Sequence, residues 1–255
     1  MFKKIMAGTV SREEGTMLIN HLVKEKPQAT VEELAYLIDN PPQNVFPKTI
    51  FHTMALTRNK VFFNLMVKSL DHKYEDVSIL AAEELAKLRG SEARNVLIEH
   101  LSSEVYHVRK ASAIALAKGF GADGVDVLKK HILASKEPFY RTTSAHGLLA
   151  GGKKGADTVV DLLNSENSNA VQTAAETIEH AAKKLGDDVI PKIIEALMSA
   201  GDRKDTLGIV QLLKAAAAFK GRAKNYEQYL SVFSDYPQEQ VRAAVSKALM
   251  MIKNH

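Results

Sequence analysis

The chain has 255 residues, of which 45% are hydrophobic, and it contains no cysteine. The lack of cysteine excludes disulfides, thiolate metal sites and a cysteine nucleophile, and no apolar run approaches the ~18 residues of a membrane-spanning helix. The formal net charge of +4 is not concentrated, which disfavours the basic stripe that phosphate binding requires. Because the apolar start before Arg12 is too short for a signal peptide, we expect a cytoplasmic protein without a membrane segment.

The N-terminal part of the chain carries two capping-box patterns, Ser11-x-x-Glu14 and Thr30-x-x-Glu33. In such a pattern each side chain can bond a free backbone amide at the start of a helix. Helices are therefore predicted at about 11–26, 30–39, 45–57 and 59–70. Since these helices fit no repeat, residues 1–70 are interpreted as an irregular helical cap, as terminal units often are.

From residue 71 onward a pattern recurs in which apolar residues fall at positions 0, +3, +4, +7 and +8 from an anchor, which is one face of an α-helix. The anchors are Val77, Val108, Tyr140, Val171, Thr206 and Val241, spaced by 31, 32, 31, 35 and 35 residues. A second helix is predicted after each of the first five, at about 91–102, 122–134, 155–164, 187–199 and 222–234. A helical period of this length is typical of stacked helix pairs. We therefore predict an all-α protein in which residues 71–255 form a repeat array, continuous with the cap.

Two segments of this array carry a family resemblance. The sequence EVYHVRKASAIAL at 104–116 and the sequence QEQVRAAV at 238–245 resemble HEAT repeats, in particular the short-period variety first described in phycobilisome lyases. The resemblance covers about residues 71–255 and implies a right-handed α-α superhelix whose anchor helices line a concave groove. Three units lack the arginine of the family's Val-Arg pair, namely those at Val77-Ser78, Val171-Gln172 and Thr206-Leu207.

Five polar residues of the anchor helices are candidates for binding a partner in that groove: Arg109, Arg141, His146, Glu176 and Arg242. The three arginines occupy the same position of three units and could form a row of cations. The alternative is structural, because one guanidinium can bond several carbonyls or a carboxylate within the protein.

Tyr106 and Tyr140 lie at the starts of two anchor helices, where they would line one rim of the groove. Aromatic side chains are good anchors at protein interfaces. They are equally ordinary packing residues at helix starts, and both interpretations stay open.

Enzymatic and metal chemistry find little support in the sequence. The glycines of 119–124 match the dinucleotide pattern G-x-G-x-x-G, but a helix and not a strand is predicted before them. His146, His180 and Glu176 could contribute to a divalent metal site. Their spacing favours solvated or hydrogen-bonding roles, so neither a catalytic residue, a metal nor a cofactor is expected.

The function predicted from these features is that of a non-catalytic scaffold or adaptor that binds another protein in the groove. Two alternatives remain. The HEAT resemblance also allows a lyase or an accessory factor for a tetrapyrrole chromophore or cofactor. The cluster formed by Lys214, Lys220, Arg222 and Lys224 allows nucleic-acid binding, which the even distribution of charge makes the weaker alternative.

Overall fold

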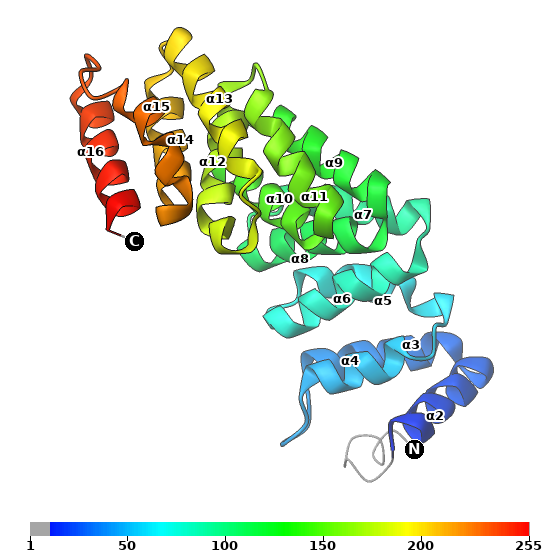
Figure 1. The fold of residues 1–255 in the computed structure, drawn as a ribbon. Helices are drawn as coiled ribbons and strands as arrows, with labels where there is room; N and C mark the ends of the chain where they lie inside the picture. The colour runs from blue at the N-terminus through cyan, green and yellow to red at the C-terminus, as the bar shows by residue number, and fades with distance from the viewer. Residues whose placement is uncertain (1–10, 255) are drawn as a thin grey trace. The chain divides into compact units, whose positions relative to one another are not determined.

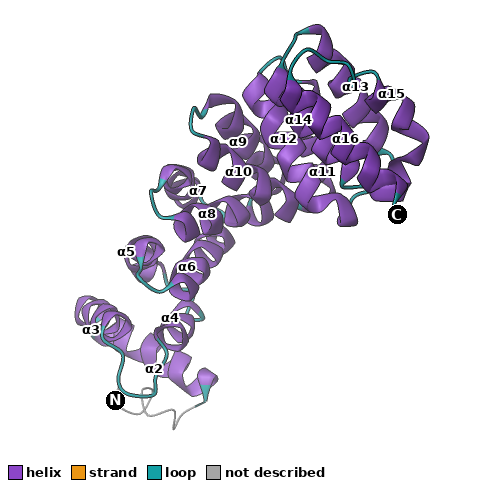
Figure 2. Ribbon diagram, turned by 90° about the vertical axis from the view of Figure 1, so that its left-hand side faces the viewer, coloured by secondary structure: helices purple, strands orange, loops and turns teal. Residues whose placement is uncertain are grey.

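The computed structural model describes residues 11–254, and every regular element in this range is a helix (Figure 2). Fifteen of these elements are the α-helices α2 to α16, so the predicted all-α class is confirmed for the described residues. None of the described helices is long and apolar enough to cross a membrane. The chain divides into two compact units, Met1–Phe120 and Gly121–His255. The predicted boundary near residue 70 falls inside the first unit, and the predicted continuous superhelix stays a prediction.

The first unit is built from pairs of helices (Figure 1), which form two layers that Figure 2 shows side by side. Helices α4, α6 and α8 pack side by side in one layer, while α3, α5 and α7 each pack against the layer-one helix that follows it in sequence. The elements are α2 (Arg12–Glu25), α3 (Pro27–Asp39), α4 (Pro47–Ala55), η1 (Lys60–Phe62), α5 (Phe63–Lys68), η2 (Ser69–Asp71), α6 (Glu75–Leu88), α7 (Ser91–Glu99), η3 (His100–Ser102) and α8 (Tyr106–Gly119), where η marks a 3₁₀ helix. We call the layer of α4, α6 and α8 the first layer.

The two predicted capping boxes have different outcomes. The box of Ser11 and Glu14 is confirmed: the Ser11 hydroxyl accepts from the Glu14 amide at 3.2 Å, and the Glu14 carboxylate accepts from the Ser11 amide at 2.7 Å. The box starting at Thr30 is wrong, because α3 already begins at Pro27. Proline is well suited to the first helical position, where its missing amide costs nothing. Thr30 consequently lies inside the helix and its hydroxyl donates to the carbonyl of Lys26 at 2.7 Å.

The second unit repeats this two-layer construction. Helices α10, α12, α14 and α16 form its first layer, and α9, α11, α13 and the pair η6–α15 pack on one side of that layer. The elements are α9 (Gly121–Ala134), α10 (Pro138–Ala150), α11 (Gly152–Asp161), η4 (Leu162–Asn164), α12 (Ser168–Ala181), η5 (Ala182–Lys184), α13 (Val189–Asp202), α14 (Thr206–Ala217), η6 (Lys220–Tyr226), α15 (Glu227–Ser231) and α16 (Glu239–Lys253).

Two predictions for the C-terminal repeats need correction. The helix expected at 222–234 is a 3₁₀ segment followed by the short α15. The anchor Thr206 is half-buried, and the buried face of α14 begins two residues later, at Gly208 and Ile209. The reason is the helix cap: the Asp205 carboxylate accepts from the Gly208 amide at 3.0 Å, so that Thr206 opens the helix instead of facing the core.

Alanines form the middle of the buried face in the first-layer helices, as the sequence predicted. Ala81, Ala113, Ala175 and Ala216 all have no exposed surface. Their small side chains let neighbouring helices pack closely, so the polar side chains at the edges of these helices come within reach of one another.

Candidate functional site

The three repeat arginines make the same hydrogen bonds in each of their units. The Nη1 of Arg109 donates to the carbonyls of Ser103 and Glu104 at 2.7 and 3.0 Å. Each of these acceptors precedes the arginine by five or six residues, just before the helix starts. Such bonds satisfy carbonyl groups that the preceding chain leaves without a partner.

Arg141 and Arg242 repeat this geometry. Arg141 donates from Nη1 to the carbonyls of Ser135 and Lys136, and Arg242 donates to those of Tyr236 and Pro237 at 2.8 and 2.7 Å. Arg109 and Arg141 are only 5% exposed, whereas Arg242 is exposed. The hydrogen bonds therefore correspond to the structural alternative for these arginines, and a role in binding a partner stays a prediction.

The two rim tyrosines lie in different units and are described separately. Tyr106 is 54% exposed, and its ring lies 5.8 Å from both the Arg109 guanidinium carbon and the Lys110 ammonium. Tyr140 is half-buried, with its ring centroid 4.3 Å from that of Phe139 and 6.4 Å from that of His131. Tyr106 thus offers an exposed aromatic ring in unit 1, whereas the ring of Tyr140 packs against Phe139 and His131.

His131 is a half-buried histidine of α9, which packs against α10 in unit 2. Its Nδ1 lies 2.9 Å from the Ser144 hydroxyl, and burial lowers the pKa of His131 below its ordinary value of 6.5. The neutral form is therefore preferred in the folded protein. Since the unfolded chain binds the proton more readily, this contribution to stability is present above about pH 6.5 and is lost as the pH falls through the folded pKa.

We expect a corresponding pH dependence of stability. Between about pH 7.5 and about pH 5.5 the free energy of unfolding should fall, and His131→Gln should reduce that fall by removing one titrating group. Urea unfolding of both proteins at the two pH values measures the difference. A variant that loses as much stability on acidification as the wild type would contradict the assignment.

His146 and Glu176 are brought together with further polar residues on the first layer of unit 2. From Arg141 onward, the residues of α10 that are not fully buried are Thr142, His146, Leu149 and Ala150. From Val171 onward, those of α12 recur with the same spacing at Gln172, Glu176, Glu179 and His180. Residues spaced by four, seven and eight lie on one side of a helix. This side is the one that the second-layer helices leave uncovered.

Polar contacts join these stripes across neighbouring helices. The Thr142 hydroxyl donates to the Glu176 carboxylate at 3.4 Å, and the rings of His146 and His180 meet edge to face with centroids 6.4 Å apart. The next contact runs from α12 to α14, where the Gln211 amide donates to Glu179 at 2.8 Å. We call these six residues, Thr142, His146, Glu176, Glu179, His180 and Gln211, the polar face.

One histidine of the polar face is held by the backbone of its own helix. The Nδ1 of His180 donates to the backbone carbonyl of Glu176 at 2.7 Å, which fixes its ring beside its own helix. Among residues 11–254 no cluster of three or more histidine and carboxylate side chains could hold a metal ion. What these residues can offer is a set of donors and acceptors held in place by their neighbours.

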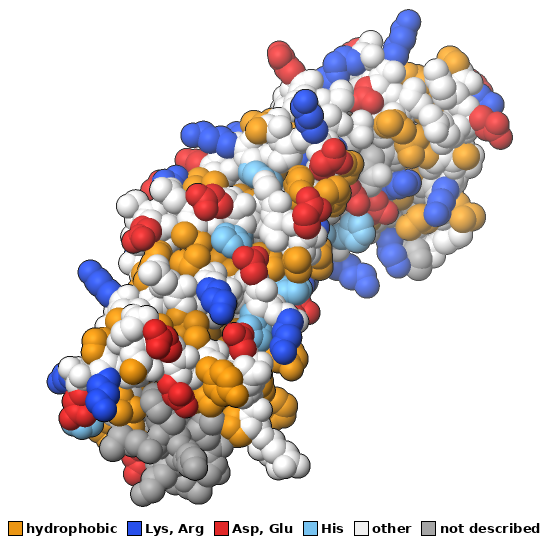
Figure 3. Space-filling model, turned by 180° about the vertical axis from the view of Figure 1, so that it is seen from behind, with side chains coloured by type: hydrophobic (Ala, Val, Ile, Leu, Met, Phe, Trp, Pro, Cys, Tyr) orange, Lys and Arg blue, Asp and Glu red, His pale blue; other side chains and the backbone are white. Residues whose placement is uncertain are grey.

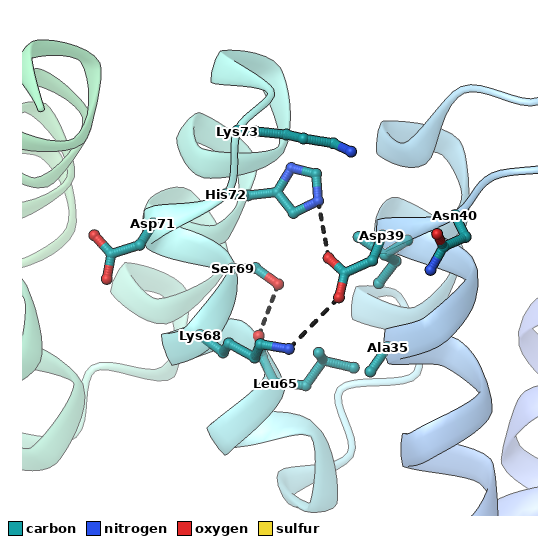
Figure 4. Close-up of a pocket in the computed structure, with 10 residues that line it drawn as sticks. Ala35, Asp39, Asn40, Leu65, Lys68, Ser69, Asp71, His72 and Lys73 are labelled. Carbon is teal, nitrogen blue, oxygen red and sulfur yellow. Dashed lines mark hydrogen bonds and ion pairs between the residues drawn. The ribbon is translucent and has the colours of Figure 1, made fainter.

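Unit 1 contains a hollow of about 310 Å³ between α3 and the connection from α5 to α6 (Figure 4). Asp39 lies in its middle, 3.3 Å from Nε2 of His72 and 3.5 Å from Nζ of Lys68. His72 is only 8% exposed, and burial lowers its pKa although Asp39 opposes the shift. The Tyr74 amide donates to Nδ1 of His72 at 3.1 Å, so the proton of the neutral ring is on Nε2, toward Asp39.

This hollow includes a serine, a histidine and an aspartate, but they do not form a catalytic triad. Ser69 is buried and its hydroxyl donates to the carbonyl of Leu65 at 2.7 Å. Both nitrogens of His72 are directed at Tyr74 and Asp39, so neither can accept a proton from the serine, as a general base must. Asp39 instead links α3 to the segment before α6.

The two remaining sequence candidates are the glycine motif and the basic cluster. The glycine motif at 119–124 lies where α8 ends and α9 begins, without the preceding strand that dinucleotide binding requires. In the basic cluster, Arg222 donates to the carbonyls of Ala182 and Leu185 at 3.0 and 2.6 Å and pairs with Asp187. On the side of the molecule seen in Figure 3, basic and acidic side chains are intermixed. One cation of the basic cluster, Arg222, is therefore already bonded within the protein.

Sequence reasoning missed Thr142, Glu179 and Gln211, which lie on the polar face. A usable signal exists, because Thr142 precedes Glu176 by 34 residues and Glu179 precedes Gln211 by 32 residues. Both separations equal about one repeat period. The Asp39–His72 contact spans one period as well, but nothing in the local pattern distinguishes it from any other pair at this spacing.

Comparisons with known proteins agree with the helical pattern. Residues 64–149, from α5 to α10, match the family model of HEAT repeats. No curated protein matches the chain. Among solved structures, an engineered protein is 22% identical over 75% of this chain and 96% of its own, with a TM-score of 0.40. Human deoxyhypusine hydroxylase, solved with glycerol, is 14% identical over 92% of this chain and 99% of its own, with a TM-score of 0.41.

A designed armadillo repeat protein is 17% identical over 74% of this chain and 99% of its own, with a TM-score of 0.35. At such identities and TM-scores these likenesses carry no inference about activity or partners. Residues 64–149 therefore match HEAT repeats. The described part of the chain is all-α, with its helices packed in consecutive pairs.

Proposed function

We propose that this protein is a non-catalytic scaffold that binds another protein through the polar face of unit 2. The observation that carries the proposal is the cross-helix contact of that face. Side chains from α10, α12 and α14 touch one another through Thr142–Glu176, His146–His180 and Glu179–Gln211. Donors and acceptors that are already held in place lose less conformational entropy when a partner binds.

The architecture supports a protein as the ligand. Helix-pair repeats typically present an extended surface formed by one layer of helices, and proteins with such repeats use it for binding. The polar face spans three consecutive first-layer helices and is left uncovered by the second layer. A surface of this kind fits a polar interface, in which about one hydrogen bond forms per 100–200 Å².

The other predicted binding residues have defined places in this proposal. Arg109, Arg141 and Arg242 hold the chain before their helices and so fix the helices' starts. Tyr106 is a second contact for a partner in unit 1, because it is exposed and flanked by two cations. A specific relation to the phycobilisome-lyase type of HEAT repeat stays a prediction.

The proposal is tested by capture of a partner with a matched pair of charge reversals. Glu176→Lys changes the centre of the polar face, whereas Glu195→Lys makes the same change at an exposed position of α13 in the second layer. The tagged wild type and both variants are incubated with lysate, and the bound proteins are quantified by mass spectrometry. We expect a stoichiometric partner with the wild type and Glu195→Lys, reduced about tenfold or more with Glu176→Lys.

Circular dichroism serves as the control for folding, because all three proteins should have the same helicity. Equal recovery of every bound protein by the wild type and both variants would contradict a site on the polar face. An eluate with a visible chromophore and no stoichiometric protein would instead favour the tetrapyrrole alternative.

A further inference from the structure

A hollow of about 310 Å³ lies between the C-terminal halves of α14 and α16, next to the polar face of unit 2. Ala217, Ala248 and Met251 line it with apolar surface, and the two alanines are only 2% exposed. Lys214 and Lys247 stand on either side of it, one from each helix. The hollow thus combines an apolar lining with two cationic side chains.

The same position of the repeat is hollow in unit 1. A space of about 380 Å³ lies between the C-terminal halves of α6 and α8. When the helices are aligned by their buried faces, Ala86 corresponds to Ala217 and Ala115 corresponds to Ala248. The hollow therefore occurs at equivalent positions of two pairs of first-layer helices, one in each unit.

Small residues keep this space open. In unit 1 a Cβ atom added to Gly119 would lie 2.5 Å from the Cβ of Ala86, so the two helices already approach closely below the hollow. In unit 2 the half-buried Ala218 and Ala244 contribute only methyl groups to its walls. An apolar side chain from outside can occupy such a space without moving the helices.

The cations around the unit 2 hollow are available to a ligand. Lys214 and Lys247 are exposed and make no ion pair within residues 11–254. Glu179 also lines the hollow, but its carboxylate accepts the amide of Gln211 at 2.8 Å. The rim therefore carries two positive charges and one negative charge, and neither lysine is held in an ion pair within the described residues.

The unit 1 hollow has a comparable rim. Arg89 and Lys118 line it, are exposed and make no ion pair in the described part of the chain. Lys87 is already bound to Glu84 at 2.6 Å, and Glu83 contributes one negative charge. Two cations without an ion pair, beside an apolar lining and one carboxylate, thus occur at the same repeat position in both units.

Building on the proposed function, we propose that the Lys214–Lys247 hollow binds an aliphatic side chain of the partner protein that is flanked by Asp or Glu. The apolar lining removes the aliphatic side chain from water, and the two ammonium groups attract the neighbouring carboxylates. The volume lies at the lower end of the ~300–1,000 Å³ of ligand pockets, which suits one side chain better than a large cofactor. Nucleic acid would meet the cations but gain little from the alanine-lined floor.

The test uses a phage-displayed library of random peptides, selected on the immobilised full-length wild type. We expect the enriched sequences to share an aliphatic residue with acidic residues next to it. An enriched peptide is then labelled, and its Kd is measured by fluorescence anisotropy for the wild type and the variants. Affinity should fall as salt is added, because exposed charges contribute to it.

Three variants separate charge, shape and nonspecific effects. The double change Lys214→Glu and Lys247→Glu should raise the Kd about tenfold or more, since like charges then face each other. The double change Lys129→Glu and Lys192→Glu alters net charge equally on the second layer and should leave the Kd within about twofold. Ala244→Leu fills the hollow but keeps both lysines, and should raise the Kd about fivefold or more by excluding the aliphatic side chain.

Enrichment of basic or purely apolar peptides, or no enrichment, would overturn the hollow as an acidic-peptide site. An enriched acidic peptide could also bind through net charge alone. The lysine pair of the hollow and the control pair on the second layer would then weaken its affinity equally, and this result would overturn the proposal as well. The proposed scaffold function would survive these results if Glu176→Lys still reduces capture of the partner. If Glu176→Lys captures as much partner as the wild type, the proposed function itself is wrong.

Discussion

Replacing Gly155 with alanine is expected to destabilise the second unit strongly. Gly155 lies in α11, where that helix crosses α10. A Cβ at this position would lie 1.8 Å from the carbonyl oxygen and 2.7 Å from the carbonyl carbon of Leu148. Because both atoms belong to the backbone, no rotation of a side chain can relieve the clash, and the two helices would have to separate.

The expected cost exceeds the gain in helix propensity. Overpacking of a core costs about 1–3 kcal/mol and occasionally more, whereas a change from glycine to alanine in a helix gains about 1 kcal/mol. For Gly155→Ala we expect a net loss of about 3 kcal/mol or a failure to fold, because the clash involves rigid backbone.

Gly90→Ala is the control for this prediction. A Cβ at Gly90 would have no atom within 4 Å, and its φ of −83° suits any residue. Because Gly90 is the N-cap of α7, where alanine is less favourable than glycine, the free energy of unfolding of this variant should fall by no more than about 1 kcal/mol. Urea unfolding followed by circular dichroism measures both changes. Equal stability of Gly155→Ala and the wild type would show that α10 and α11 do not pack as described.

The second large effect is expected for Arg141→Met. The Arg141 guanidinium is 5% exposed and donates to the carbonyls of Ser135 and Lys136 and to the Thr173 hydroxyl. Methionine keeps much of the aliphatic volume but leaves one buried acceptor, Thr173, and two part-buried carbonyls without this donor. A buried polar group without a partner costs about 1–3 kcal/mol, so we expect a loss of about 3 kcal/mol in the free energy of unfolding.

Arg242→Met is the matched comparison. Arg242 donates to the two equivalent carbonyls of its own unit, at 2.8 and 2.7 Å, but it is exposed. Water can replace the lost donors there, so the loss should stay below about 1 kcal/mol. If both variants lose the same free energy of unfolding, burial does not determine how much the hydrogen bonds of Arg141 stabilise the protein.

The helices of this protein could be predicted well because their signals are local. The anchors Val77 and Val108 are completely buried, as their spacing predicted. The errors arise where a local signal competes with a stronger neighbour. Thr30 resembles a helix cap, but Pro27 begins the helix three residues earlier. Thr206 fits the period, but the cap at Asp205 shifts the buried face by two residues.

The site was less predictable because its residues meet through tertiary packing. His146 and Glu176 were identified from their places on neighbouring helices, but their actual contacts are with His180 and Thr142. A periodic arginine cannot reveal from sequence whether its guanidinium faces a partner or its own backbone. That distinction depends on where the preceding segment turns, which for Arg141 places two carbonyls beside Nη1.

The most direct test of the account is site-specific photo-crosslinking in native lysate. Gln172 lies one turn before Glu176 on the uncovered side of α12, and Lys192 is exposed on α13 in the second layer. A photoreactive amino acid is placed at one position or the other in the full chain, and crosslinked products are identified by mass spectrometry. We predict a discrete crosslink to a partner protein from position 172 and none to that partner from position 192. A partner crosslinked from position 192 but not from position 172 would contradict binding through the polar face.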